Sequence, residues 1–379
     1  MRKENEAVTT DPNVLPGLNA PEKPNNKQRD KYQNAFFIFG LVVLAIMVTQ
    51  LDFTEAWDGL RHAGYWFLAI VILWAFLYLF NTASWMLIIR SVQRVPNEDG
   101  ARMTSHFVTS STSSSSSRIS FWWLYKVSVS GFALNYATPG GLMGGEPYRI
   151  MELAPKIGTE RASSSVILYV MTHIFCHFCF WGICIILFLI TQPVTLFLRL
   201  LLGAAGLFCV LGIWFFLNGY RKGLAVRMLN VLRHFPYIRK WSMPFVEKHK
   251  EQLDTIDRQI AALHRQSKST FVAAVLLEVT CRFISAFEVM FALLVLTNHV
   301  SYLFCLFTIA FTTLFANLLF FIPLQLGGRE GGFLMSITQL GMSASSGIFV
   351  ALLVRLRELI WTGIGLLMIK FHRRQKERK

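Results

Sequence analysis

The sequence predicts an all-α polytopic membrane protein with about six full spans and two re-entrant helical hairpins in an inverted-repeat arrangement. Of its 379 residues, 54% are hydrophobic and only 16% are charged, against roughly 25% charged residues in a soluble domain. Apolar runs recur from about residue 34 to residue 370, and several reach the ~20 residues that a helix needs to cross a bilayer. Lys and Arg number 37 against 22 Asp and Glu, and the excess lies beside these runs. Such placement is typical of topology signals and of contact with anionic membrane lipids, so we expect no nucleic-acid partner.

The predicted elements follow one another along a single domain, residues 34–370. Before it, residues 1–33 are polar and rich in Asn and Pro, and we expect a flexible cytoplasmic tail. The first apolar run has no small-residue cleavage site after it, so we expect a span and not a secretory signal. The basic loop of residues 219–269 is amphipathic and is expected to lie on the inner leaflet, and residues 371–379 form a basic cytoplasmic tail. The six expected full spans are residues 34–50, 64–90, 164–190, 195–218, 270–297 and 346–369.

The distribution of Lys and Arg predicts which loops face the cytoplasm, because cytoplasmic loops retain positive charge. The 219–269 loop carries 11 of these residues, whereas residues 298–302 carry none. The basic loop and both termini are therefore expected in the cytoplasm. If the apolar stretches 120–137 and 302–322 both crossed the membrane completely, the 219–269 loop would lie outside. The basic loop and both termini can all be cytoplasmic only if each stretch begins a re-entrant hairpin. Hairpin 120–163 would then dip from the cytoplasm and hairpin 302–345 from outside.

With these hairpins, the chain divides into two halves, about residues 34–191 and 195–370, that run in opposite senses. Many transporters use such inverted repeats, and their interrupted segments meet near the midplane to form the substrate site. The arrangement therefore directs attention to the residues that interrupt the two hairpins.

Two Gly- and Pro-rich breaks interrupt the hairpins. The first is NYATPGGLMGGEPYRIME at residues 135–152, and the second is FIPLQLGGREGG at residues 321–332. In each break an acid, Glu146 or Glu330, follows a proline by seven residues. So dense a cluster of breakers leaves backbone groups unpaired, and at membrane depth such backbone must lie against protein or line a wet cavity.

Arg149 and Arg329 stand beside these two acids and are candidates for holding an anionic head group such as a phosphate. The acids would orient the arginines or receive an amine on the same head group. The alternative is that both breaks are turns at the membrane surface, in which glycine supplies positive φ and the charges are merely solvated.

Ionisable residues also lie inside two of the predicted spans. They are Glu278, Arg282 and Glu288 in one span and Arg355, Arg357 and Glu358 in the last. Residues 278 and 282 are four apart, so they share a helix face and can pair. Both clusters fit a functional site in the bundle interior and equally fit a structural ion pair between helices. His173 and His177 are also four apart, but further metal ligands are missing, so a buried or interface pair is favoured and neither metal nor cofactor is expected.

Together with LVRLRELIWTGIGLL in the last span, the two motifs resemble the transmembrane region of lysylphosphatidylglycerol synthases, over about residues 34–370. This region defines a broad family of flippase-like membrane proteins. The resemblance implies a role in lipid transfer. In full-length family members the membrane region moves an aminoacylated phospholipid from the inner to the outer leaflet, and a C-terminal cytosolic domain makes that lipid. Because the chain stops at Lys379, we expect that synthase domain to be absent. Carried over to this chain, the resemblance marks Asn135, Pro139, Gly141, Gly145, Glu146, Arg149, Pro323, Gly327, Gly328, Arg329, Glu330, Gly331 and Arg355.

These observations lead us to expect a lipid translocator in the cytoplasmic (inner) membrane that moves a polar or aminoacylated phospholipid or a glycolipid between leaflets. Because GxSxG, P-loop and Rossmann motifs are missing, we expect neither an enzyme nor an ATP-driven pump. Two alternatives stay open: a membrane transferase with Glu146 or Glu330 as general base, and a non-transporting partner of a separate synthase or glycosyltransferase. The residues expected to bind the lipid are Asn135, Pro139, Gly140, Gly141, Gly144, Gly145, Glu146, Arg149, Glu278, Arg282, Pro323, Gly327, Gly328, Arg329, Glu330 and Arg355.

Overall fold

The computed structural model describes residues 53–94, 119–137, 145–219, 268–318 and 328–377, and in these ranges it contains nine helices and no strand. Four stretches within these helices are long and apolar enough to cross a membrane: Ala63–Gln93, Arg161–Thr191, Leu196–Leu217 and Ser269–Leu293. The all-α prediction is therefore confirmed for the described part of the chain. The predicted span 34–50, the tail 1–33 and most of the basic loop 219–269 lie outside the described residues.

The four long apolar helices agree with four of the predicted spans. They are α2 (Phe53–Arg94), α6 (Thr159–Thr191), α7 (Leu196–Gly219) and α11 (Lys268–Leu293). Helix α2 is interrupted at Gly64, whose φ of 49° lies in the left-handed region that glycine adopts without strain, so the apolar span begins at this break. Helix α11 ends four residues before the predicted boundary, because the amides of Leu296 and Thr297 both turn back to the Leu293 carbonyl at 2.9 Å.

Helix α14 (Ala344–Glu377) contains the sixth predicted span, 346–369, and continues into the basic tail. It is not among the four helices that are both long and apolar enough to cross a membrane, and it carries Arg355, Arg357 and Glu358 in the middle of its apolar stretch. All three residues are buried. The charges therefore point into the helix bundle, as polar groups in spanning helices generally do.

The two predicted hairpins each contain a pair of packed helices. In the first, α4 (Phe121–Ala137) contacts α5 (Gly145–Ile157); in the second, α12 (Tyr302–Leu318) contacts α13 (Gly328–Gln339). At 17 residues, α4 and α12 are shorter than a typical span. Residues 138–144 of the first Gly- and Pro-rich break and residues 321–327 of the second lie outside the described residues.

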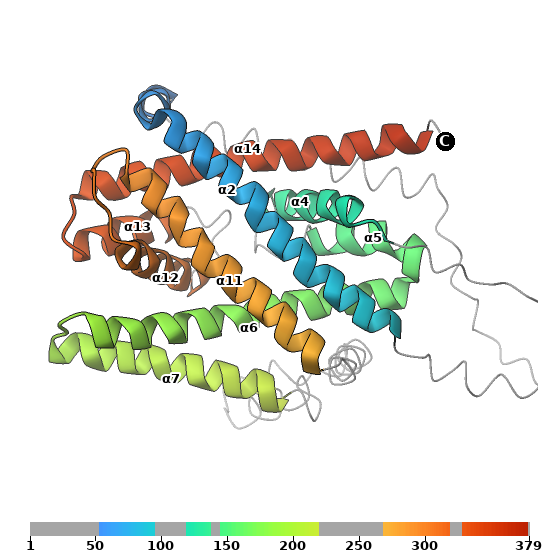
Figure 1. Cartoon of the computed structure of the whole chain (residues 1–379), viewed down its shortest axis with the longest axis horizontal. Helices are drawn as coiled ribbons and strands as arrows, with labels where there is room; N and C mark the ends of the chain where they lie inside the picture. Colours follow the sequence, from blue (N-terminus) through green and yellow to red (C-terminus); the bar gives the residue numbers. More distant parts are fainter. Residues whose placement is uncertain (1–52, 95–118, 138–144, 220–267, 319–327, 378–379) are drawn as a thin grey trace, which may run out of the picture.

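The helix contacts of the two halves correspond. When α2, α4, α5 and α6 are matched with α11, α12, α13 and α14, every main contact in the first set has a counterpart in the second, such as α5 with α6 and α13 with α14. Contacts between the sets correspond as well, because α4 packs on α14 and α12 packs on α6. The most extensive contact joins α2 to α11. These two helices correspond to each other in the matching, so their contact is its own counterpart. Figure 1 shows these two helices running obliquely across the bundle, with α4 and α5 toward one end and α12 and α13 toward the other.

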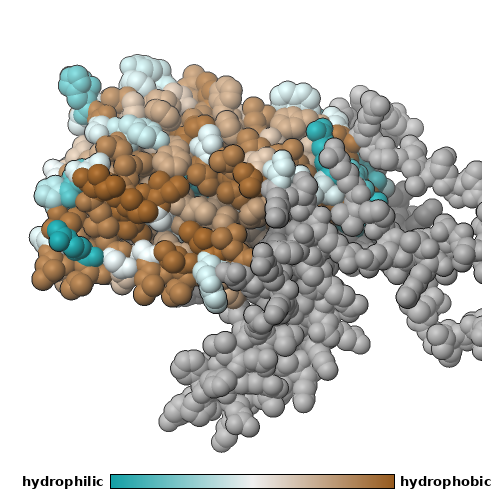
Figure 2. All heavy atoms as spheres, turned by 60° about the horizontal axis from the view of Figure 1, so that its bottom comes forward, coloured by the Kyte–Doolittle hydropathy of each residue, from teal (hydrophilic) through white to brown (hydrophobic). Residues whose placement is uncertain are grey.

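The outside of the bundle is apolar. Large side chains along α7 are exposed, including Leu196 at 73% and Phe197 at 78%, and others on α2 and α11 continue this surface. Figure 2 shows apolar side chains over most of one face, with the hydrophilic ones mainly toward its edges. A soluble monomer rarely exposes an apolar patch above a few hundred Å², so this surface fits a hydrocarbon surrounding.

Candidate functional site

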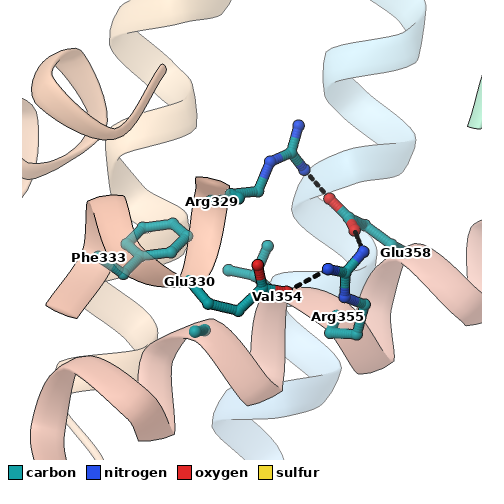
Figure 3. A pocket seen from close by; sticks show the side chains of 7 residues that line it. Arg329, Glu330, Phe333, Val354, Arg355 and Glu358 are labelled. Atoms are coloured by element: carbon teal, nitrogen blue, oxygen red, sulfur yellow. Dashed lines mark hydrogen bonds and ion pairs between the residues drawn. The ribbon is translucent and has the colours of Figure 1, made fainter. Parts of the chain in front are cut away.

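Charged side chains from α13 and α14 form a connected group that we call the charged network: Arg329, Glu330, Arg355, Arg357 and Glu358. Glu358 pairs with Arg329, and its Oε2 lies 3.5 Å from Arg355 Nη1 (Figure 3). Arg355 in turn pairs with Glu330, at the first turn of α13. Alternating charges thus extend from the start of α13 into the middle of α14.

Tyr136 connects the first hairpin to the charged network. Its hydroxyl donates to Glu358 Oε1 at 2.9 Å and accepts from Arg329 Nη1 at 3.1 Å. Tyr136 lies at the start of the first break and Arg329 near the end of the second, 193 positions apart in the sequence. The two breaks therefore each contribute a residue that contacts the same carboxylate.

Arg357 and Glu288 anchor the network to α11. Arg357 Nε and Nη2 each lie 2.8 Å from Glu288 Oε1, and both side chains are only 2% exposed. The guanidinium also lies 3.8 Å from the centroid of the Trp74 ring, within the range of a cation–π contact. With Glu288 included, three arginines face three carboxylates, so the buried part of the site is close to neutral.

A small pocket lies beside the network. Its lining residues are Arg329, Glu330, Phe333, Ala351, Val354, Arg355 and Glu358. It has almost no room even for a water molecule, whereas typical ligand pockets enclose ~300–1,000 Å³. Glu330 is 38% exposed and Arg329 26%, whereas Glu358 is 1% exposed. The pocket is thus too small for a lipid head group in this conformation. Its more accessible charged residues, Arg329 and Glu330, both lie on α13.

Arg149 lies among aromatic rings, away from this pocket. It is 1% exposed, and its guanidinium carbon is 4.6 Å from the Phe132 ring centroid, 5.3 Å from Tyr169 and 5.6 Å from Trp85. Its Nη1 is 3.9 Å from Glu146 Oε1, and its Nε has no hydrogen-bond partner among the described atoms. The cation is stabilised chiefly by ring faces, so Arg149 braces α5 against α2, α4 and α6.

Asn135 ties the end of α4 to the start of α5. Its Nδ2 donates to Glu146 Oε1 at 2.9 Å, and its Oδ1 accepts from the Gly145 amide at 2.7 Å. Glu146 occupies the first turn of α5, where the helix dipole favours an acid. A Cβ on Gly145 would overlap the Gly131 carbonyl oxygen and the Asn135 side chain. Glycine at 145 is therefore needed for the close approach of the two helices.

Glu278 and Arg282 meet through a third residue, His173 of α6. His173 Nδ1 lies 2.8 Å from Glu278 Oε2, and His173 Nε2 lies 2.6 Å from Arg282 Nη2. Glu278 is 1% exposed, and its other oxygen has no hydrogen-bond partner among the described atoms. The helix face that Glu278 and Arg282 share therefore presents them to α6. In the described part of the chain, no group of three or more His, Cys, Asp and Glu residues could hold a metal ion.

The expected lipid-binding residues thus fall into three places. Arg329, Glu330 and Arg355 line the pocket, with the buried Gly328 at the start of α13. Asn135, Gly145, Glu146 and Arg149 form the junction of α4 and α5, while Glu278 and Arg282 meet at His173. The remaining ones, Pro139, Gly140, Gly141, Gly144, Pro323 and Gly327, lie outside the described residues.

Tyr136, Glu288, Arg357 and Glu358 belong to the site but were not among the residues expected to bind lipid. The last three carry a visible signal, because each is a charged residue inside a predicted span. Tyr136 carries none, since it is one of ten tyrosines in an aromatic-rich chain. His173 was noted only as half of an i, i+4 histidine pair, and its actual partners lie over 100 residues away.

Comparison with known proteins gives one family match. The family model described as "Lysylphosphatidylglycerol synthase TM region" matches residues 35–365, which is most of the chain. No curated protein and no solved structure shows a significant match.

Proposed function

Because this chain belongs to the family of the lysylphosphatidylglycerol synthase TM region, we propose that it moves polar phospholipids or glycolipids between the leaflets of the cytoplasmic membrane. One observation carries the proposal: Tyr136 of the first break and Arg329 of the second meet at Glu358 in the bundle interior. Both termini lie in the cytoplasm in this proposal, and the lipid crosses without chemical change.

The corresponding helix contacts of the two halves support an inverted-repeat arrangement. In this arrangement α4 with α5 and α12 with α13 are re-entrant hairpins that enter from opposite sides. Transporters of this kind bind their substrate where interrupted segments meet. The charged network contains residues from or in contact with both breaks. For this reason we assign the lipid head group to the charged network and not to the surroundings of Arg149.

The internal carboxylates of the network stand where an anionic head group would bind. Glu330 is the most exposed of them and pairs with Arg355. A lipid phosphate offers oxygen acceptors to Arg355 and Arg329 in the same way, and guanidinium groups bind phosphate bidentately. When Glu330 turns away, the lipid phosphate takes its place beside Arg355, so no buried arginine is left unpaired. The pocket must widen to admit the head group, and separation of α13 from α14 provides the space.

Leaflet exchange of head-group-labelled lipids in proteoliposomes tests the proposal. The probes are phosphatidylglycerol, an aminoacylated phosphatidylglycerol and a phosphate-free glycolipid. Wild type exchanges at least one of them. For the phosphate-bearing probes, Arg355→Gln lowers the rate by about tenfold or more, because a charge-assisted hydrogen bond contributes ~1.5–3 kcal/mol. Arg199→Gln, on the exposed surface of α7, stays within about twofold, as surface substitutions usually do.

Two outcomes contradict the proposal. Wild-type liposomes that exchange none of the probes count against a translocator that works by itself. If wild type, Arg355→Gln and Arg329→Gln exchange the phosphate-bearing lipids at equal rates, the lipid head group does not bind to the charged network.

A further inference from the structure

The His173 cluster, formed by His173, Glu278 and Arg282, holds an imidazole between a carboxylate and a guanidinium. His173 Nδ1 is 2.8 Å from Glu278 Oε2, while Arg282 Nη2 is 2.6 Å from Nε2 and 3.4 Å from Nδ1. The cluster lies between α6 and α11, and its residues do not line the pocket of the charged network. The proposed lipid site therefore does not account for it.

The contacts with Arg282 favour a neutral imidazole. A guanidinium has only donors and keeps its charge, and one of its nitrogens lies within 3.4 Å of both ring nitrogens. An imidazolium at this distance would place two cations in contact, so His173 is neutral in this arrangement. Arg282 is balanced by Glu278 across the ring.

A second proton on this ring would turn it into a cation in direct contact with Arg282. Two cations at this distance repel each other, so the guanidinium would have to leave. Proton binding and the Arg282 contact are therefore mutually exclusive. His173 is more accessible than its carboxylate partner, since its side chain is 29% exposed and that of Glu278 is 1% exposed.

We propose that His173 is a proton-binding site, that a proton displaces Arg282 from it, and that this exchange couples lipid translocation to a proton gradient. The proposal rests on the proposed function. It goes further by assigning an energy source and a second ligand, the proton, to a site distinct from the lipid site.

The other groups around His173 favour this role over that of a fixed ion pair. On α6, His177 and Tyr169 flank His173 with ring centroids at 5.4 and 6.0 Å, and Cys176 lies on the same helix. On α11, Cys281 adjoins Arg282 in sequence, and on α5 the Arg149 cation lies 5.3 Å from the Tyr169 ring. Among the described residues, Glu278 is the only carboxylate bonded to the ring, so departure of Arg282 leaves His173 and Glu278 as a neutralised pair.

Helix α11 provides a physical link from this site to the charged network. It carries Arg282 and Glu278 and, further along, Glu288, which holds Arg357 at 2.8 Å. A movement of α11 away from α6 that follows the departure of Arg282 therefore acts on the partner of Arg357. The two sites share a rigid element whose position both of them bias.

The test is a pH gradient across proteoliposomes that contain wild type or His173→Gln. Glutamine offers an N–H to Glu278 and a carbonyl oxygen to Arg282, so it imitates the neutral imidazole but cannot bind a proton there. With one proton per lipid, a gradient of one pH unit drives up to about a tenfold leaflet ratio of labelled lipid in wild type. His173→Gln still exchanges lipid, but its leaflet ratio stays near unity. His299→Gln, at an exposed histidine between α11 and α12, keeps the wild-type ratio.

A ratio that survives in His173→Gln, or a wild type that exchanges lipid without responding to the gradient, overturns the proton site and leaves translocation standing. If wild type exchanges no lipid, the proposed function fails, and the proton site is then judged by ¹⁵N NMR of histidine-labelled protein. The signal that is absent from His173→Gln must show a neutral ring at neutral pH and a doubly protonated ring at lower pH. A ring that stays neutral as the pH falls, or one that is doubly protonated at neutral pH, overturns the inference.

Discussion

Arg357 illustrates the cost of a charge inside this bundle and the way in which the structure offsets it. The residue is 1% exposed, pairs with Glu288 of α11 and lies against the Trp74 ring of α2. Removing one member of a buried ion pair leaves the other charge uncompensated, whereas replacing both by apolar residues is often tolerated. Its charge at membrane depth could be predicted from the sequence, but its partner could not.

A double-mutant cycle checks this pair. Glu288→Leu is expected to lower the free energy of unfolding by about 3–5 kcal/mol, because Arg357 loses its partner in a buried setting. The double variant with Arg357→Met is expected to lose less than Glu288→Leu alone. Denaturant unfolding in detergent micelles, followed by circular dichroism, gives the three values. Simple addition of the two single effects would show that the residues do not interact energetically.

At the scale of the element, helix boundaries followed from apolar runs, but helix contacts depend on small residues whose role is visible only in the packing. Gly363 and Gly365 stand two residues apart on α14. A Cβ on Gly365 would meet the Val129 carbonyl oxygen of α4 at 2.9 Å, whereas a Cβ on Gly363 would have nothing within 4 Å. The Gly365 carbonyl also accepts from Ser130 Oγ of α4 at 3.0 Å. One glycine of the two is thus required for the contact between α4 and α14.

Alanine at these two positions should have opposite effects. Gly365→Ala is expected to destabilise the protein by about 1–3 kcal/mol through overpacking against α4. Gly363→Ala is expected to be neutral or to stabilise it by up to about 1 kcal/mol, because alanine is the better helix former. Thermal unfolding of the two variants in the same detergent gives the comparison. Equal behaviour would mean that α4 and α14 do not approach as closely as described.

At the scale of the whole molecule, the open question is the sense in which each half crosses the membrane. The contacts between α4 and α5 and between α12 and α13 are those of hairpins, and the ends of each hairpin carry exposed residues: Ser120 and Thr159 for the first, and His299 and Ser343 for the second. If the hairpins are re-entrant, both ends of one hairpin lie on the same side. If they span the membrane, the two ends lie on opposite sides.

Single cysteines at these four positions, in a variant without the six native cysteines, decide between the two topologies. A membrane-impermeant thiol reagent is expected to label Ser120→Cys and Thr159→Cys only from the cytoplasmic side. It is expected to label His299→Cys and Ser343→Cys only from outside. Ala286→Cys, at a fully buried position of α11, serves as the unlabelled control. Labelling of the two ends of either hairpin from opposite sides would refute the re-entrant arrangement.

The sequence by itself determined that this is a helical membrane protein and where four helices able to cross a membrane lie, and it predicted which residues interrupt the two expected hairpins. These are local properties, because the transfer of an apolar run into hydrocarbon and the loss of backbone hydrogen bonds at Gly and Pro depend on neighbouring residues alone. The tertiary structure decided which charges meet: Arg329 and Tyr136 at Glu358, Arg357 at Glu288, and His173 between Glu278 and Arg282. A residue's partner depends on which helix faces pack together, and that packing is set by contacts spread over the whole chain. For this reason Arg149, expected at an open head-group site, lies instead among three aromatic rings.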